Sequence, residues 1–194
     1  DFSTIRPKGA EVKGVGSDAS GPLSFMDCWD SMCRTVHSAG ARRGAMMGCL
    51  RIDHPDIEDF IDAKRDGARF RNFNLSVLVS DGFMQALEDD SEWPLIFGGE
   101  TYRTVQAKAL WQLLMQATYD VAEPGVIFID RINARNNLHY CETIAATNPC
   151  GEQPLPSYGC CDLGPIILTR FVRHPFGRGG VAAFDFEAFE QAVA

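Results

Sequence analysis

The sequence predicts an α/β fold in which short strands alternate with helices along the whole chain. Apolar runs of strand length, such as VIFID at 126–130, are separated by longer segments whose apolar residues recur at helical spacing. The chain has 194 residues, of which 45% are hydrophobic and 23% are charged, as is typical of one folded domain. The sequence contains no internal repeat and no interdomain linker. We therefore expect a single domain over 1–194 with parallel strand pairing.

Glycine and proline mark the first elements. The segment 8–24 is rich in glycine and serine, which predicts a loop. A helix is expected from Pro22 to about Gly40, where a glycine suits the residue after a helix end. The apolar face of that helix would contain Met26, Trp29, Cys33 and Val36.

The central elements follow from the same signals. HPDIEDFIDAKR (54–65) predicts a helix with Pro55 near its start. Its buried side would contain Ile57, Phe60 and Ile61. FNLSVLVS (73–80) alternates as a strand does, and Ser80 or Asp81 then caps a short helix. A longer helix is expected over 104–122.

The last elements are expected to be two buried strands and a terminal helix. The strands are VIFID and IILTRFV (166–172). Asp185 is expected to cap the final helix. The chain opens at Asp1 rather than at a methionine and closes inside that helix, so we expect a piece of something longer.

Charge and targeting signals argue against several classes of function. A formal net charge of −8 disfavours a general nucleic-acid binder, which would carry a basic patch. The sequence has no apolar run of the roughly 18–20 residues that span a bilayer. The opening DFSTIRPKGAEVKG lacks the apolar segment of a secretory signal. The seven cysteines are therefore expected to be free thiols in a reducing cytoplasm.

Two glycine loops are candidates for binding anions. Backbone N–H groups in the first loop, 8–24, could approach an anion closely. In GARRGAMMGC (40–49), Arg42 and Arg43 could meet phosphate or carboxylate. A surface loop and two solvated arginines would explain the same residues. Both interpretations stay open on local sequence alone.

The segment NPCGEQPLPSYGCCD (148–162) holds three of the seven cysteines. It lacks the C-x2-C pairs of structural zinc sites, and the nearest histidine is His139, so we expect no metal. The expected compartment argues against a disulfide scaffold. Simple packing is the alternative for each thiol, and we expect it for Cys28, Cys33, Cys49 and Cys141.

The pattern Asn148, Cys150, Glu152 favours a catalytic interpretation. In an extended segment, alternate side chains point to one side, so the amide, the thiol and the carboxylate would face one substrate. Pro149 and Gly151 also fit an irregular, sharply shaped loop, which is the alternative geometry. No histidine is adjacent to act as a base for a cysteine nucleophile. A neighbouring carboxylate disfavours a thiolate. The arrangement therefore suits a thiol that reacts through its hydrogen atom, which is radical chemistry, with Glu152 acting on the substrate.

These residues resemble the active-site segment of ribonucleotide reductase large subunits. Their sequence is most similar to the class II, adenosylcobalamin-dependent form. The resemblance rests on five blocks in the family's order and covers residues 1 to about 172. The blocks are GSDASGPLSFM, GARRGAMMGCLRIDHPDIEDFIDAKRD, FNLSVLVSDGFMQAL, GVIFIDRIN and ATNPCGEQPLPSYGCCDLG. The resemblance implies part of a ten-stranded α/β barrel with a central finger loop. It also implies that this chain is an internal fragment of the catalytic subunit.

The resemblance implies roles for the residues of the 148–162 segment. Cys150 would hold a thiyl radical that takes the 3′ hydrogen of the ribose. Glu152 would be the base at the 3′ hydroxyl, and Asn148 would orient the same region. The backbone of Pro149 and Gly151 would also touch the substrate. Cys161, chosen over Cys160 because CDLG is the recurrent part of the family pattern, would be one of two thiols that end as a disulfide. Its partner would lie upstream of residue 1.

The resemblance assigns the glycine loops to effector recognition. The two specificity loops would lie at 14–21 and 40–48, beside a helix that forms a dimer interface. The candidate effector residues are Asp18, Ser20, Gly21, Arg42, Arg43 and Gly44. The implied effectors are deoxynucleotides and ATP.

The predicted activity is the reduction of ribonucleotides to 2′-deoxyribonucleotides for DNA synthesis. Ribonucleoside diphosphates are the first candidate substrates, and triphosphates are the second. The implied cofactor is adenosylcobalamin, and the implied reductant is of the thioredoxin or glutaredoxin type. A homodimer in the cytoplasm is expected, with no nucleic-acid polymer and no membrane. The alternatives are a class I subunit whose radical comes from a metal-bearing partner, and a non-catalytic deoxynucleotide sensor. A thiol oxidoreductase would need a C-x2-C dithiol, which is absent.

Overall fold

The structure is a computed structural model that describes residues 1–12, 14, 16–36, 44–65 and 67–194. The chain divides into two compact units, Asp1–Gly159 and Cys160–Ala194. Among the described residues, no helix has the length and apolar character that crossing a membrane requires. All seven cysteines lie in the described ranges and are free.

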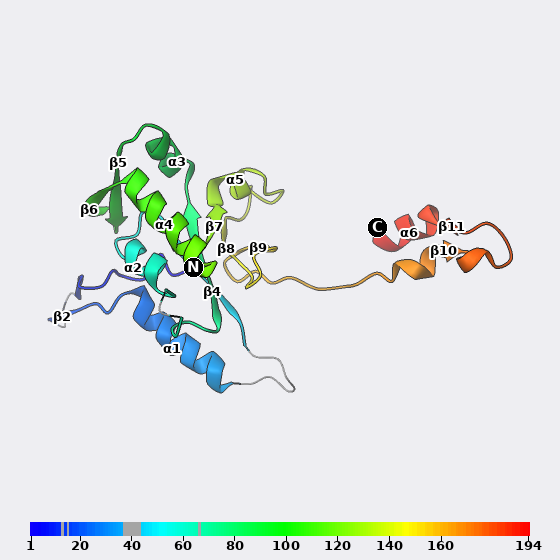
Figure 1. The fold of residues 1–194 in the computed structure, drawn as a ribbon, viewed down its shortest axis with the longest axis horizontal. Helices are drawn as coiled ribbons and strands as arrows, with labels where there is room; N and C mark the ends of the chain where they lie inside the picture. The colour runs from blue at the N-terminus through cyan, green and yellow to red at the C-terminus, as the bar shows by residue number, and fades with distance from the viewer. Residues whose placement is uncertain (13, 15, 37–43, 66) are drawn as a thin grey trace. The chain divides into compact units, whose positions relative to one another are not determined.

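A three-stranded parallel sheet forms the centre of the first unit (Figure 1). Its strands, in spatial order, are β3 (Met46–Arg51), β4 (Phe73–Val79) and β7 (Gly125–Phe128). Val77 of β4 pairs with Leu50 on one side and with Val126 on the other. The predicted α/β alternation with parallel pairing is therefore confirmed. Within the described residues the sheet does not close into a barrel.

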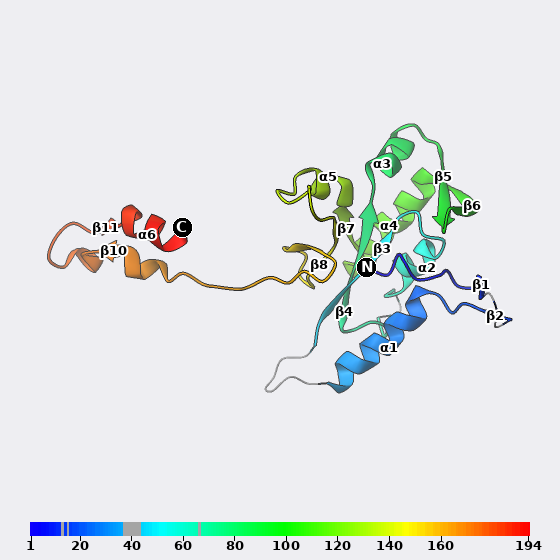
Figure 2. The same ribbon diagram turned by 180° about the vertical axis from the view of Figure 1, so that it is seen from behind.

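Four helices place their apolar sides in the main core of the first unit. They are α1 (Pro22–Thr35), α2 (Ile57–Asp62), α3 (Asp81–Glu88) and α4 (Ala107–Val121). Helix α4 lies in front of the sheet in Figure 1 and behind it in Figure 2, so it covers one face. The core joins these helices to alternate residues of the strands, among them Leu50, Leu75, Val77 and Val79. The predicted buried side of α2 is confirmed, because Ile57, Phe60 and Ile61 are all buried.

Helix α1 buries only part of its predicted apolar face within this chain. Met26 is completely buried, but Trp29 and Val36 are 50% and 64% exposed, so the predicted apolar face does not enter the core as one surface. Three exposed apolar side chains, Phe25, Trp29 and Met32, lie along the helix, and the exposed Val36 follows its last residue. The helix ends at Thr35, and the predicted stop at Gly40 lies outside the described residues.

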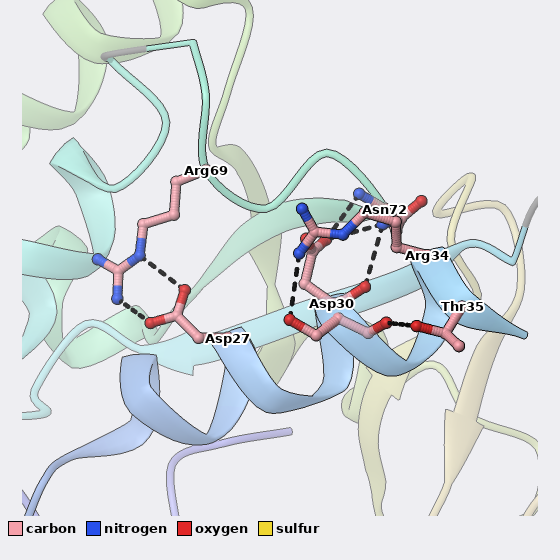
Figure 3. A network of polar contacts seen from close by, with 7 residues as sticks. Asp27, Asp30, Arg34, Thr35, Arg69 and Asn72 are labelled. Atoms are coloured by element: carbon pink, nitrogen blue, oxygen red, sulfur yellow. Dashed lines mark hydrogen bonds and ion pairs between the residues drawn. The ribbon is translucent and has the colours of Figure 1, made fainter.

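Polar contacts join α1 to the segment that enters β4 (Figure 3). The Arg69 guanidinium donates to both carboxylate oxygens of Asp27, at 2.9 and 2.6 Å. Asp30 is buried, and its Oδ1 accepts from the backbone N–H and the side-chain amide of Asn72, at 2.9 and 3.1 Å. A buried carboxylate needs such partners to offset its desolvation. These contacts fix the chain immediately before β4 begins.

The other face of the sheet carries a smaller apolar cluster. Cys49, Leu78 and Ile127 are buried there, one from each strand. The cluster is covered by Ala146 of β8 (Ile144–Thr147) and by Ile129 and Ile132 of α5 (Ile129–Ala134). Strand β8 pairs antiparallel with β9 (Pro154–Pro156).

An antiparallel hairpin was missed by the sequence analysis. It pairs β5 (Glu92–Phe97) with β6 (Glu100–Gln106). The helix predicted over 104–122 therefore begins later, at Ala107, because Thr104 pairs with Pro94 inside the hairpin. The predicted Ser80 cap is confirmed, since its hydroxyl accepts from the backbone N–H of Phe83 at 3.2 Å. A shorter hairpin near the N-terminus pairs β1 (Glu11–Val12) with β2 (Ser17–Asp18).

The second unit has little buried surface, because each of its residues is exposed or half-buried. The strand predicted at 166–172 is wrong. Those residues form the 3-10 helix η1 (Leu168–Phe171) and the start of β10 (Val172–Arg173), and within the unit nothing covers Ile166 and Ile167 as a buried strand requires. The remaining elements are η2 (Pro175–Gly177), β11 (Ala183–Phe184) and α6 (Phe186–Val193). The predicted Asp185 cap of α6 is confirmed by a 3.1 Å hydrogen bond from the Ala188 N–H.

Candidate active site

A tight turn between β8 and β9 carries the residues Asn148 to Gln153. Its backbone closes through two hydrogen bonds, from the Gly151 N–H to the Asn148 carbonyl at 3.0 Å and from the Asn148 N–H to the Gln153 carbonyl at 3.2 Å. Gly151 has a φ of +85°, in the left-handed region that glycine adopts without strain. Proline at 149 and 154 limits the backbone on either side. The sequence therefore specifies a turn at this point rather than a continuous strand.

The turn brings the side chains of Asn148 and Glu152 together. The Asn148 amide Nδ2 donates to Glu152 Oε1 at 2.7 Å, and Asn148 Oδ1 accepts from the backbone N–H of Gln153 at 3.0 Å. The extended geometry expected from the alternating pattern is therefore wrong. Asn148 and Glu152 lie close together because the chain reverses direction between them, so that residues four positions apart meet across a turn. Cys150 lies between them in sequence and is exposed.

The turn is attached to the sheet by Asn74 of β4. The Asn74 side-chain amide Nδ2 donates to the carbonyl oxygen of Pro149. The sequence analysis missed this residue. Its signal was present, because Asn is a poor strand former and yet lies inside the predicted strand FNLSVLVS.

Strand β8, which leads into the turn, contacts Cys49 of β3. This thiol is completely buried in β3 and has a backbone hydrogen bond with Thr147 at the end of β8. Burial raises the pKa of the Cys49 thiol, and the Thr147 contact opposes that rise in part. Packing, as predicted, is the role of Cys49. The same prediction is wrong for Cys28 and Cys141, which are exposed. Cys33 is half-buried, beside Gly44.

Two grooves of the first unit reach the turn. One, of about 560 Å³, runs from Pro149 along Met46, Met47 and Phe73 to Phe25 and Trp29 of α1. The other, of about 500 Å³, is lined by Thr147 and Gly151 together with Arg131 and Arg135. Two arginines, Arg131 and Arg135, therefore line the same groove as Gly151 of the turn.

The described candidate effector residues, Asp18, Ser20, Gly21 and Gly44, lie near the two ends of α1. Asp18 and Ser20 are exposed, and Gly21 is the residue before the helix. Gly21 has a φ of +81°, and a Cβ there would lie 2.8 Å from Asp56 Oδ2. Near the other end of the helix, a Cβ on Gly44 would lie 3.0 Å from Cys33 Sγ. Arg42 and Arg43 lie outside the described residues.

The remaining predicted residue, Cys161, lies in the second unit with Cys160, and both thiols are exposed. Among the residues that the structure describes, no group of three or more His, Cys, Asp or Glu side chains could hold a metal ion. The turn itself offers a thiol, a carboxylate and an amide that donates to the carboxylate.

Comparison with known proteins shows what the chain is similar to. The family model described as "Ribonucleotide reductase, barrel domain" matches residues 1–194. The chain is 39% identical over 174 residues to a "Vitamin B12-dependent ribonucleoside-diphosphate reductase" of Thermoplasma acidophilum and 40% identical to one of Mycobacterium tuberculosis, in each case over 88% of this chain. It is 35% identical over its whole length to a "Vitamin B12-dependent ribonucleotide reductase" of Streptomyces coelicolor.

The chain spans about a quarter of the length of these relatives. The matched parts make up 23%, 25% and 22% of the three proteins.

Proposed function

The chain belongs to the ribonucleotide reductase barrel-domain family, and from this premise we propose that it forms the thiol-bearing part of a ribonucleotide reductase catalytic subunit. The reaction is the reduction of ribonucleotides, with diphosphates as the first candidates, to 2′-deoxyribonucleotides. One observation carries the proposal. The turn at 148–153 holds the Asn148 amide against the Glu152 carboxylate, with the exposed Cys150 thiol between them in sequence.

Cys150 and Glu152 have complementary tasks at the ribose. As a thiyl radical, Cys150 takes the hydrogen atom from C3′, so that an S–H bond forms as the C–H bond breaks. Glu152 takes the proton of the 3′ hydroxyl. The Asn148 amide occupies Oε1 of Glu152, so we assign the other carboxylate oxygen to the substrate hydroxyl. The same amide fixes the carboxylate before the substrate arrives, and such preorganisation lowers the cost of reaching the reactive geometry.

The two electrons of the reduction come from cysteine thiols. A ribonucleotide and two thiols give a deoxyribonucleotide, one disulfide and one water, so the 2′ oxygen leaves as water. We assign Cys161 as one of the two thiols, with its partner in a part of the protein outside this chain. A thioredoxin- or glutaredoxin-type dithiol would then reduce the disulfide. This need, together with the seven free cysteines, supports a location in the reducing cytoplasm.

Adenosylcobalamin is the cofactor we propose, because the relatives are named as vitamin B12-dependent. When bound, it supplies the radical that removes the hydrogen atom from the Cys150 thiol. The exposed position of Cys150 fits this requirement, since a buried thiol could not be reached.

The exposed stripe of α1 supports a homodimer. Phe25, Trp29 and Met32 are 47–50% exposed and recur at helical spacing, as expected of a helix that packs against a second helix. We propose that effector deoxynucleotides or ATP bind beside this helix, at the loops that contain Asp18, Ser20 and Gly21 and the segment 42–44. The two units of the chain would belong to one barrel domain of the complete protein.

The test uses the full-length protein that carries this sequence, purified anaerobically with a dithiol reductant. Conversion of labelled CDP to dCDP is measured with and without adenosylcobalamin, with Cys150→Ala as the control. Turnover that requires the cofactor and disappears in the variant supports the proposal. Turnover that ignores the cofactor but needs a metal-bearing partner would assign the chain to class I. A wild type that binds deoxynucleotides without turnover in either assay would be a sensor.

A further inference from the structure

Asn74 occupies an unusual position in the sheet. The other six residues of β4 are buried, whereas Asn74 is exposed. A polar side chain in a buried parallel strand lowers the tendency to form that strand, so a compensating contact is expected. The contact is the hydrogen bond from the Asn74 amide to the Pro149 carbonyl, which joins residues 75 positions apart in the sequence.

The acceptor is the carbonyl of the peptide that joins Pro149 to Cys150. A peptide unit is planar, and the same plane contains the carbonyl oxygen of Pro149 and the Cα atom of Cys150. A donor that fixes this oxygen therefore fixes the direction in which the chain enters Cys150. Two backbone hydrogen bonds, from the Gly151 N–H to the Asn148 carbonyl and from the Asn148 N–H to the Gln153 carbonyl, close the turn internally but do not attach it to the sheet.

The backbone on both sides of Asn74 is itself held by a charged pair. Lys64 Nζ donates to the Phe73 carbonyl at 2.6 Å and to Glu123 Oε1 at 2.8 Å. Glu123 Oε2 accepts from the Leu75 N–H at 3.1 Å. β7 pairs with β4 only from Ser76 onward, so these two side chains bond the strand before its β7 ladder begins. One residue further upstream, Asn72 is fixed to Asp30 of α1 (Figure 3).

We infer that Asn74 is a positioning residue for the reaction: its amide fixes the Pro149–Cys150 peptide and so sets the position of the Cys150 sulfur relative to the substrate. Lys64 and Glu123 keep the backbone of Asn74 in the geometry that this contact requires. The inference rests on the proposed function for the meaning of the sulfur position, but the contact itself does not. A hydrogen-atom transfer needs its reacting atoms in close approach, and a displacement of about 1 Å can cost roughly a hundredfold in rate.

The test compares Asn74→Ala and Asn74→Asp with the wild type in the full-length protein. Gln112→Glu is the charge control, because Gln112 is exposed on α4 and makes the same amide-to-acid change away from the turn. Two readouts are taken: amide hydrogen exchange of residues 144–158 and 73–79 in the cofactor-free protein, and kcat and KM for CDP reduction with adenosylcobalamin.

The expected result is a local change. In both Asn74 variants, amide exchange in the turn rises about tenfold, as the loss of one net hydrogen bond implies, while exchange of β4 stays unchanged. The kcat falls about a hundredfold with little change in KM, because the substrate still binds but the thiol is misplaced. Gln112→Glu leaves both readouts at the wild-type level.

Two results would overturn the inference. One is unchanged turn exchange and kcat in the Asn74 variants. The other is loss of protection in β4 together with the turn and a matching rise in KM, which would make Asn74 a general structural residue. If the wild type itself shows no turnover, the proposed function fails, and the exchange readout alone still decides whether Asn74 fixes the turn.

Discussion

The two faces of the three-stranded sheet differ in what they bury. The helix-covered face belongs to a core of twenty buried residues contributed by four helices and the strands. The opposite face is covered by α5 and by the β8–β9 hairpin, and we call it the hairpin-covered face. Among the described residues, its cluster contains three buried residues, Cys49, Leu78 and Ile127. Buried apolar area is the main source of folding free energy, so most of the stability should come from the first face. The second face carries polar contacts to the turn with the candidate catalytic residues. The residues that provide most of the stability and those that position the candidate catalytic turn therefore lie on opposite faces of one sheet.

The largest effect that would test this comparison is a truncation on the helix-covered face. Phe60 of α2 is completely buried, so Phe60→Ala should lower the free energy of unfolding by about 3–5 kcal/mol, through lost burial and a remaining cavity. Urea unfolding measures the change. Phe176→Ala is the matched control, since Phe176 is 96% exposed and its loss should stay within about 0.5 kcal/mol. Equal costs for the two variants would show that the core does not provide the stability assigned to it.

A pair of identical substitutions sharpens the contrast on the hairpin-covered face. Cys49→Ser places a hydroxyl in a buried site and should cost about 1–3 kcal/mol. Cys150→Ser changes an exposed thiol and should cost less than about 0.5 kcal/mol, yet abolish nucleotide reduction, because a serine cannot form a thiyl radical. Unfolding curves and the CDP assay are measured on both. A Cys150→Ser protein that is destabilised as much as Cys49→Ser would remove the separation of the two roles.

A smaller effect is expected at the end of β4. The Ser80 hydroxyl caps α3 by accepting from the Phe83 N–H, so Ser80→Ala should destabilise by about 1 kcal/mol. Ser80→Asp keeps a capping oxygen and should restore most of that loss. If neither substitution changes the urea midpoint, the helix start is held by packing of Phe83 alone.

The smallest effect we expect is a dependence of the free energy of unfolding on pH that arises from His54. Its ring is completely buried: Nε2 lies 3.0 Å from the Ile5 carbonyl, and Nδ1 accepts from the Asp56 N–H at 3.1 Å. Burial lowers the pKa of His54 below its usual 6.5, against smaller raising contributions from the Ile5 carbonyl and the nearby Asp56 and Asp53. The folded state therefore favours the neutral form of the His54 imidazole. The unfolded chain takes up the proton first, so stability is full above about pH 6.5 and falls as the pH drops below it.

The measurement is the free energy of unfolding between pH 7.5 and about 5.5, for the wild type and His54→Gln. The glutamine variant has no proton to gain and should show a flatter profile. Asp56 acts in the opposite direction at lower pH, because burial raises the pKa of its carboxyl group. An identical slope in both proteins would assign the pH dependence to other groups.

The sequence was informative where a local signal decides the structure. The strand at 73–80, the buried side of α2 and the caps at Ser80 and Asp185 depend on neighbours within a few residues, and all were predicted correctly. The hairpin of β5 and β6 had a local signal that the sequence analysis missed, because only Gly98 and Gly99 separate its two strands. Whether 166–172 forms a buried strand depends instead on another segment that would pair with it. Local periodicity contains no information about that partner.

The candidate site shows the same limit. Residue types at 148, 150 and 152 indicated the chemistry. The alternating pattern wrongly suggested an extended segment, whereas Pro149 and Gly151 correctly indicated an irregular loop. The turn is encoded by Gly151 and the flanking prolines together. Asn74 could not be connected with Pro149 from the sequence, because their contact exists only once the sheet and the hairpin have both formed.

The pairing of Asn148 with Pro149 has a consequence for the chemical lifetime of the site. Asparagine side chains age by deamidation, in which the backbone nitrogen of the following residue attacks the side-chain amide. Proline carries no N–H, so that route is closed at this position. Conversion to aspartate would set a second carboxylate against Glu152 at the place where the amide now donates at 2.7 Å. The proline therefore protects the one amide whose slow loss would turn an attraction at the site into a repulsion.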